Sequence, residues 1–124
     1  MTAYIWESLQ GHPCLGESEA AGQLRAVKCA TGQVKPAAGS GLAALFGPGM
    51  LSGRARVVLT VEPGQKVEAV EYRKQRMDWK YVRTLTASGR DVYYVMLPDF
   101  PDDWLDVTLR VSGQQKADRI WLGW

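Results

Sequence analysis

The sequence predicts an all-β protein built as an antiparallel β-sandwich. The clearest strand runs from Leu105 to Val111, where apolar Leu and Val residues alternate with Asp, Thr and Arg. This alternation gives a strand one buried side and one solvent-facing side, which is typical of antiparallel sheets. Turn signals recur at spacings of roughly 8–12 residues, as in sandwiches and small barrels. The 124 residues have the length of a single domain, which we place over 1–124.

The domain has two parts that differ in their sequence pattern. Residues 1–53 hold nine of the 13 glycines, whereas residues 54–124 carry the alternating pattern. We expect the first part to be irregular and Gly-rich, with short strands at Ala3–Trp6 and Leu24–Cys29. The stretch Leu42–Phe46 lies between glycines and is expected to form one helical turn that packs on the sheets.

The second part begins with a strand over Arg54–Glu62, which ends at the turn residues Pro63 and Gly64. In the next segment, Val67–Tyr72, the apolar residues move from odd to even positions. A change of phase inside one strand predicts a β-bulge, because one extra residue moves every later side chain to the opposite face.

The remaining strands follow from turn residues in the same way. Trp79–Leu85 and Val92–Leu97 flank a Ser-Gly pair and predict a hairpin. Pro98 follows directly and prevents a central strand from continuing. A last strand over Lys116–Trp124 is expected to close the sheet after a second Ser-Gly turn.

The second part resembles a known kind of domain. Val67–Arg73 followed by Trp79, with Leu105–Val111 further on, is similar to an immunoglobulin-like or fibronectin type III-like sandwich over about residues 54–124. The resemblance implies a binding or spacer role and brings no catalytic residues with it. No Cys pair brackets Trp79, so an antibody-type domain is not expected.

The two cysteines, Cys14 and Cys29, leave two states open. A disulfide between them would close a loop worth on the order of 3 kcal/mol. Two cysteines do not make a disulfide framework, and we expect reduced, buried thiols. Residues Met1–Glu7 have no basic start and no long apolar run, so no signal peptide is expected and a cytoplasmic or virion-associated location is favoured.

The sequence contains few residues of the kinds that carry out catalysis. His12 is the only histidine and stands two residues from Cys14, so a nucleophile–base pair is conceivable, but a loop histidine beside a structural cysteine is favoured. One His and two Cys do not complete a four-ligand zinc site. An acidic cluster can bind calcium, although a solvated loop is the favoured interpretation; its members are Asp99, Asp102, Asp103 and Asp106. We predict no enzyme, no metal and no cofactor.

Charge is distributed unevenly along the chain. Residues 54–90 hold nine Lys or Arg and four acids, a balance of +5, and residues 91–124 have a balance of −3. Cations interleaved with aromatic rings are typical of single-stranded nucleic-acid grooves; here they are Arg73, Lys74, Arg76, Lys80 and Arg83 with Tyr72, Trp79 and Tyr81. A basic and an acidic face on one module also suit packing against other subunits.

Five Trp and five Tyr residues are more than one core of this size readily buries. Four of the indoles, Trp6, Trp104, Trp121 and Trp124, stand near a chain end or a turn, so at least one is expected at the surface as an anchor for a partner. A sugar could stack on Trp79, Trp104 or Trp121 in the same way.

The predicted function is a non-enzymatic structural or adhesive protein–protein interaction module built into a larger assembly, such as a phage virion or tail. The partners are other protein subunits in a homo- or hetero-oligomer, with no membrane. A carbohydrate-binding module is one alternative, and single-stranded nucleic-acid binding through residues 73–83 is another. The predicted partner-binding residues are Trp104, Trp121, Trp124, Arg73, Arg76, Lys80 and Arg83.

Overall fold

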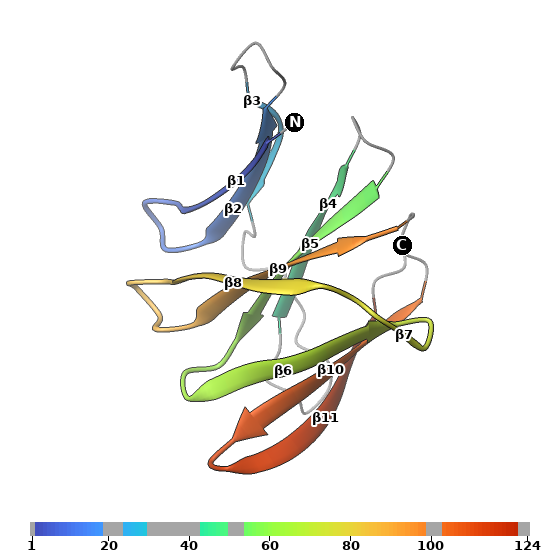
Figure 1. Ribbon diagram of the computed structural model, residues 1–124. Coiled ribbons are helices and arrows are strands. Elements are labelled where there is room, and N and C mark those ends of the chain that lie inside the picture. The colour runs from blue at the N-terminus through green and yellow to red at the C-terminus, as the bar shows by residue number, and fades with distance from the viewer. Residues whose placement is uncertain (1, 19–23, 30–42, 50–53, 99–102, 122–124) are drawn as a thin grey trace.

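The computed structural model describes residues 2–18, 24–29, 43–49, 54–98 and 103–121, and these are all-β (Figure 1). The strands are β1 (Thr2–Glu7), β2 (Pro13–Ser18), β3 (Leu24–Cys29), β4 (Ala43–Gly49), β5 (Arg54–Val61), β6 (Gln65–Tyr72), β7 (Gln75–Arg76), β8 (Trp79–Thr84), β9 (Asp91–Leu97), β10 (Trp104–Val111) and β11 (Gln114–Trp121). The described residues include no helix that is long and apolar enough to cross a membrane.

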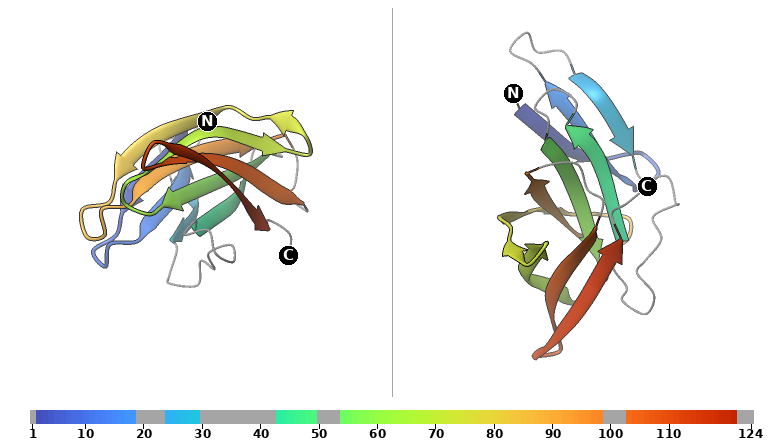
Figure 2. Two further views of the ribbon diagram at one scale, coloured as in Figure 1. Left: turned by 90° about the horizontal axis from the view of Figure 1, so that it is seen from below. Right: turned by 90° about the vertical axis from the view of Figure 1, so that its right-hand side faces the viewer.

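The strands form three antiparallel sheets. The N-terminal sheet has the order β1-β2-β3, the central sheet β4-β5-β9-β8, and the outer sheet β11-β10-β6-β7. The N-terminal and outer sheets lie on opposite sides of the central sheet (Figures 1 and 2). The prediction of an all-β fold with packed antiparallel sheets is confirmed, and the immunoglobulin-like assignment stays a prediction.

The main core lies between the central and outer sheets. Alternate residues of β5 and β9 face alternate residues of β6 and β10, and nearly all are completely buried. Each such side chain contributes on the order of 1.5–3 kcal/mol by leaving water. The cluster comprises Val57, Leu59, Val61, Val67, Val70, Tyr72, Tyr93, Val95, Leu97, Leu105, Val107, Leu109 and Ile120.

A second, smaller core lies on the other face of the central sheet. Val58 and Val92 pack there with Leu15 of β2 and with Leu85, and Ile5 of β1 lies against them. Every residue from Val57 to Val61 is therefore buried. A strand covered on both faces has apolar residues at consecutive positions, as the Val-Val-Leu run of β5 does.

The predicted β-bulge is confirmed. Thr108 of β10 lies opposite Ala69, and the next residue, Leu109, lies opposite Val67, so Glu68 is the extra residue in β6. The bulge lets Val67 and Val70 both face the core although they are three residues apart.

The N-terminal sheet is fixed to the central sheet by one carboxylate and one close contact. Glu7 accepts hydrogen bonds from the amide and hydroxyl of Thr86 (3.0 and 2.9 Å) and from the amide of Ala87 (3.2 Å). Gly11 has a φ of 83°, and a Cβ there would lie 2.6 Å from the Cβ of Ala87. A larger residue at position 11 would push the two loops apart.

The strand β11 carries two charges on its inward side. Lys116 lies opposite Leu109 and Asp118 opposite Val107, and both of these partners are core residues. The Asp118 side chain is only 11% exposed, with Lys116 Nζ 3.9 Å from Oδ2. Burial raises the pKa of the Asp118 carboxyl, and the charge of Lys116 opposes this in part. The inward side of this edge strand is therefore polar at Lys116 and Asp118 and apolar at Ile120.

One expectation for the first part was wrong. The predicted helical turn at Leu42–Phe46 is instead, from residue 43 on, part of β4, which pairs with β5 from Ala43↔Thr60 to Gly49↔Arg54. A single helical turn is too short to compete with a full ladder of inter-strand hydrogen bonds. The short strands expected at Ala3–Trp6 and Leu24–Cys29 are confirmed as β1 and β3, whereas β2 was not expected.

The expectation of reduced thiols was also wrong. Cys14 of β2 and Cys29 of β3 lie directly opposite each other and form a disulfide. The pairing of the two strands brings the sulfurs together, and a spacing of 15 residues in the sequence does not reveal that register.

We expect removal of the disulfide in a Cys14→Ala, Cys29→Ala double variant to lower the free energy of unfolding by about 2–4 kcal/mol, because the open chain gains conformational entropy. Urea denaturation with and without reductant measures this. Reductant should lower the stability of the wild type alone. Equal stability of both proteins, or two titratable thiols in the wild type, would contradict the assignment.

The turn between β6 and β7 generates a second prediction. Arg73 and Lys74 form a two-residue loop with φ angles of 52° and 64°, a conformation that Asn and Gly adopt at lower cost. We expect Lys74→Gly to raise the free energy of unfolding by about 0.5–1 kcal/mol. Lys80→Gly makes the same change in extended backbone and should lower the free energy of unfolding. Thermal denaturation of both variants tests this difference.

Candidate functional site

Trp104 stands at the start of β10 and points to the solvent face of the outer sheet. Its neighbour Leu105 is buried in the core, and successive side chains of a strand alternate between faces. The indole is 39% exposed. The guanidinium carbon of Arg119 lies 5.1 Å from its ring centroid, and Arg119 Nε lies 2.8 Å from Asp106 Oδ1. The aromatic ring and the cation are thus held together in a fixed arrangement.

Arg73 extends this surface at the neighbouring turn. Tyr72 lies opposite Leu105, so the β6–β7 turn lies beside the start of β10. Arg73 Nε lies 4.0 Å from Asp103 Oδ2, and its guanidinium carbon lies 5.0 Å from the Tyr72 ring centroid. We call the five residues Arg73, Asp103, Trp104, Asp106 and Arg119 the Trp104 patch.

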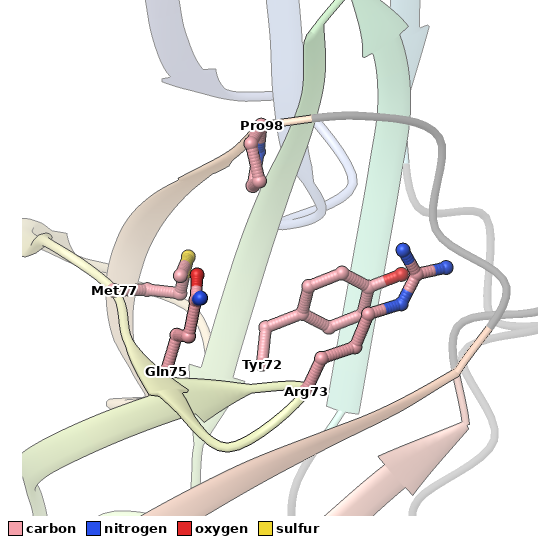
Figure 3. A pocket seen from close by; sticks show the side chains of 5 residues that line it. All are labelled: Tyr72, Arg73, Gln75, Met77 and Pro98. Carbon is pink, nitrogen blue, oxygen red and sulfur yellow. The ribbon is translucent and has the colours of Figure 1, made fainter.

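A small cavity lies next to the patch, at the end of the sandwich. It has a volume of about 220 Å³ and is lined by Tyr72, Arg73, Gln75, Met77 and Pro98. In Figure 3 the Arg73 side chain extends alongside the Tyr72 ring, while Gln75 and Met77 lie on the other side of it. One cation among mainly neutral groups gives this cavity no catalytic arrangement.

The structure brings some of the predicted partner-binding residues together and separates others. Trp104, Arg73 and Arg76 lie in the outer sheet or its β6–β7 turn, with Arg76 opposite Glu71. Trp121 lies opposite Trp104 in the backbone register, and Trp124 lies outside the described residues.

The other two predicted residues belong to the central sheet. Lys80 lies opposite Tyr94, and Arg83 lies opposite Val92 with its Nη2 4.0 Å from Glu7 Oε1. The basic stretch 73–83 therefore does not form one continuous groove, because it crosses from one sheet to another between β7 and β8.

An aromatic cluster at the edge strand β8 was not predicted from the sequence. The rings of Trp79 and Tyr81 both make edge-type contacts with the buried Tyr93 ring, at centroid distances of 5.7 and 5.8 Å and interplanar angles of 69° and 70°. Trp79 is 37% exposed because no described strand lies beyond β8 in this sheet. Spacing of two aromatic residues at i and i+2 was the available signal.

A hydrogen-bonded chain runs beside this cluster. Lys66 Nζ lies 2.6 Å from Asp91 Oδ2, and Thr84 Oγ1 donates to Asp91 Oδ1 at 2.6 Å. The hydroxyls of Tyr81 and Thr84 lie 2.7 Å apart. Burial alone would raise the pKa of Asp91, but hydrogen bonds from Lys66 and Thr84, with the charge of Lys66, outweigh it and lower the pKa.

The described residues contain no group of three or more His, Cys, Asp or Glu side chains placed to hold a metal ion. The conceivable pairing of His12 with a Cys14 nucleophile is wrong, because the Cys14 sulfur is bonded to Cys29.

Comparisons with known proteins add no assignment: no protein-family model matches the sequence, and neither the curated proteins nor the solved structures include a significant match.

The lowered pKa values of Asp91 and Glu7 predict acid sensitivity. Hydrogen bonds from Thr86 and Ala87 lower the pKa of Glu7. The unfolded-state pKa values are 3.8 for Asp91 and 4.5 for Glu7. A carboxyl whose pKa is lower in the folded state stabilises the fold at pH values above its unfolded-state pKa. This stabilisation is lost as the pH falls through the folded-state pKa. We therefore expect the free energy of unfolding to decrease below about pH 4.

Asp91→Asn should lower the free energy of unfolding at pH 7 by about 1–2 kcal/mol, because a charge-assisted hydrogen bond is lost, and should flatten its decrease in acid. Asp78→Asn, at an exposed position, is the matched control. Urea denaturation between pH 3 and 7 measures both variants. An Asp91→Asn protein with the wild-type pH profile would contradict the role of this carboxylate.

Proposed function

We propose that the protein is a non-enzymatic protein–protein interaction module, a part of a larger assembly of the virion or phage-tail kind, and that it binds a second copy of itself through the Trp104 patch. The exposed indole of Trp104, with the guanidinium of Arg119 over its ring, is the observation that carries the proposal. The resemblance to immunoglobulin-like sandwiches supports the same binding role.

The patch has the composition of an interface hot spot. Trp and Arg are the residues most enriched among those that dominate binding energy. Arg119 is already oriented by Asp106 and by the indole ring, so its side chain loses less conformational entropy when a partner binds there. These groups favour a protein as the partner.

The charges of the patch favour a copy of the same chain. Arg73 pairs with Asp103, and Arg119 pairs with Asp106. An isologous dimer places the same surface on both subunits, so a patch with both signs can set its cations against the carboxylates of the other copy. The nearby carboxylates disfavour a polyanion such as nucleic acid. Arg119 lies over the ring face on which a sugar would stack, which disfavours carbohydrate.

We expect light scattering to show a dimer or larger oligomer at high protein concentration. Trp104→Ala should weaken self-association by roughly thirtyfold, since hot-spot residues contribute about 2 kcal/mol or more. Trp79→Ala is the matched control, because this indole is almost equally exposed, at 37% against 39%, but lies outside the patch. A monomer at every concentration, or equal weakening by both variants, would contradict the proposal.

Titrations with polysaccharides and with single-stranded DNA, followed by Trp fluorescence, test the two alternatives. Saturable quenching by a polysaccharide would support carbohydrate binding instead. Binding to DNA that weakens steeply with added salt would support the nucleic-acid alternative.

A further inference from the structure

A cavity beside β8 lies between the N-terminal sheet and the central sheet. It has a volume of about 400 Å³ and is lined by Ile5, Arg56, Lys80, Tyr81, Val82, Tyr94 and Met96. The register explains this set: Arg56 lies opposite Met96, and Lys80 lies opposite Tyr94. All four thus face the N-terminal sheet, where Ile5 covers one side. Volumes of roughly 300–1,000 Å³ are typical of small-molecule sites.

Arg56 places a buried cation in this cavity. The residue is only 5% exposed. Its Nη1 donates a hydrogen bond to the Tyr94 hydroxyl, and its guanidinium carbon lies 5.8 Å from the Tyr94 ring centroid. A guanidinium held by a ring and a hydroxyl has a fixed direction, and it presents donors in the planar arrangement that a carboxylate matches.

The other lining residues define the remainder of the ligand. Lys80 adds a second cation at the exposed rim, and no carboxylate is among the lining residues. Glu7 lies nearby in the sequence of β1, but it is bound by Thr86 and Ala87. Ile5, Val82 and Met96 provide an apolar wall. The lining therefore combines two cations with apolar side chains, and the register places Arg56 directly beside Met96.

We propose that this cavity binds a small amphipathic carboxylate, with its head at Arg56 and Lys80 and its apolar part against Ile5, Val82 and Met96. This site is separate from the Trp104 patch, which lies on the far side of the outer sheet, so the two proposals do not depend on each other.

Isothermal titration with octanoate and with 1-octanol tests the class of ligand. The two probes have the same chain length and differ in the charged head. We expect saturable binding of octanoate and at least about tenfold weaker binding of the alcohol, because charge-assisted hydrogen bonds contribute about 1.5–3 kcal/mol. No binding of octanoate, or equal binding of both probes, would overturn the proposal.

Variants locate the site. Arg56→Gln should weaken octanoate binding at least about tenfold, and Lys80→Glu should weaken it by a similar factor through charge repulsion. Lys80 is exposed, so its variant is expected to fold even if Arg56→Gln does not. Lys74→Glu makes the same charge change outside the cavity and is the matched control. Equal weakening by Lys74→Glu and Lys80→Glu would overturn the assignment to this cavity.

Trp104→Ala separates this proposal from the proposed function. It should abolish or weaken self-association and leave octanoate binding within about twofold of the wild type, because distant sites without shared contacts act independently. Loss of octanoate binding in Trp104→Ala would contradict the separate site described here.

Discussion

The burial of the central sheet on both faces is the constraint on which the rest of the structure depends. Five consecutive residues of β5, Val57–Val61, are excluded from water, and a β-strand can hide all of them only if a layer covers each side. The outer sheet provides one layer and the N-terminal sheet the other (Figure 2). The Glu7 hydrogen bonds hold the N-terminal sheet against the central sheet, and the Cys14–Cys29 disulfide joins two strands within the N-terminal sheet. Both therefore help to keep one face of the central sheet buried.

The same layering separates the two surfaces to which we assign binding. Strict alternation in β10 directs Leu105 into the core and Trp104 to solvent. On the central sheet, the face turned away from that core carries Arg56, and the N-terminal sheet closes over it to leave a cavity instead of an open face. Both surfaces are therefore consequences of how each strand divides its residues between two sides.

Local patterns in the sequence predicted the structure correctly where the pattern lay within a single strand. The alternation in Leu105–Val111 predicted a half-buried strand, and the phase shift in Val67–Tyr72 predicted the bulge at Glu68. Trp104 was one of four indoles near a chain end or a turn, of which at least one was expected at the surface. What could not be predicted depends on which strands pair and in what register: the disulfide, the strand β4, and the position of Trp79 at a sheet edge. The cavity around Arg56 requires residues from four strands, and no spacing in the sequence reveals it.

The inward charges of β11 disfavour one kind of assembly, in which another strand pairs with this edge of the outer sheet. A neighbouring strand that docked along this rim would have to shut Lys116 and Asp118 away from water, next to the interior of the sandwich. That cost discourages copies of the chain from joining side by side into an endless ribbon. The two-fold contact that we propose around Trp104 would instead close on itself and give an assembly with a finite number of subunits.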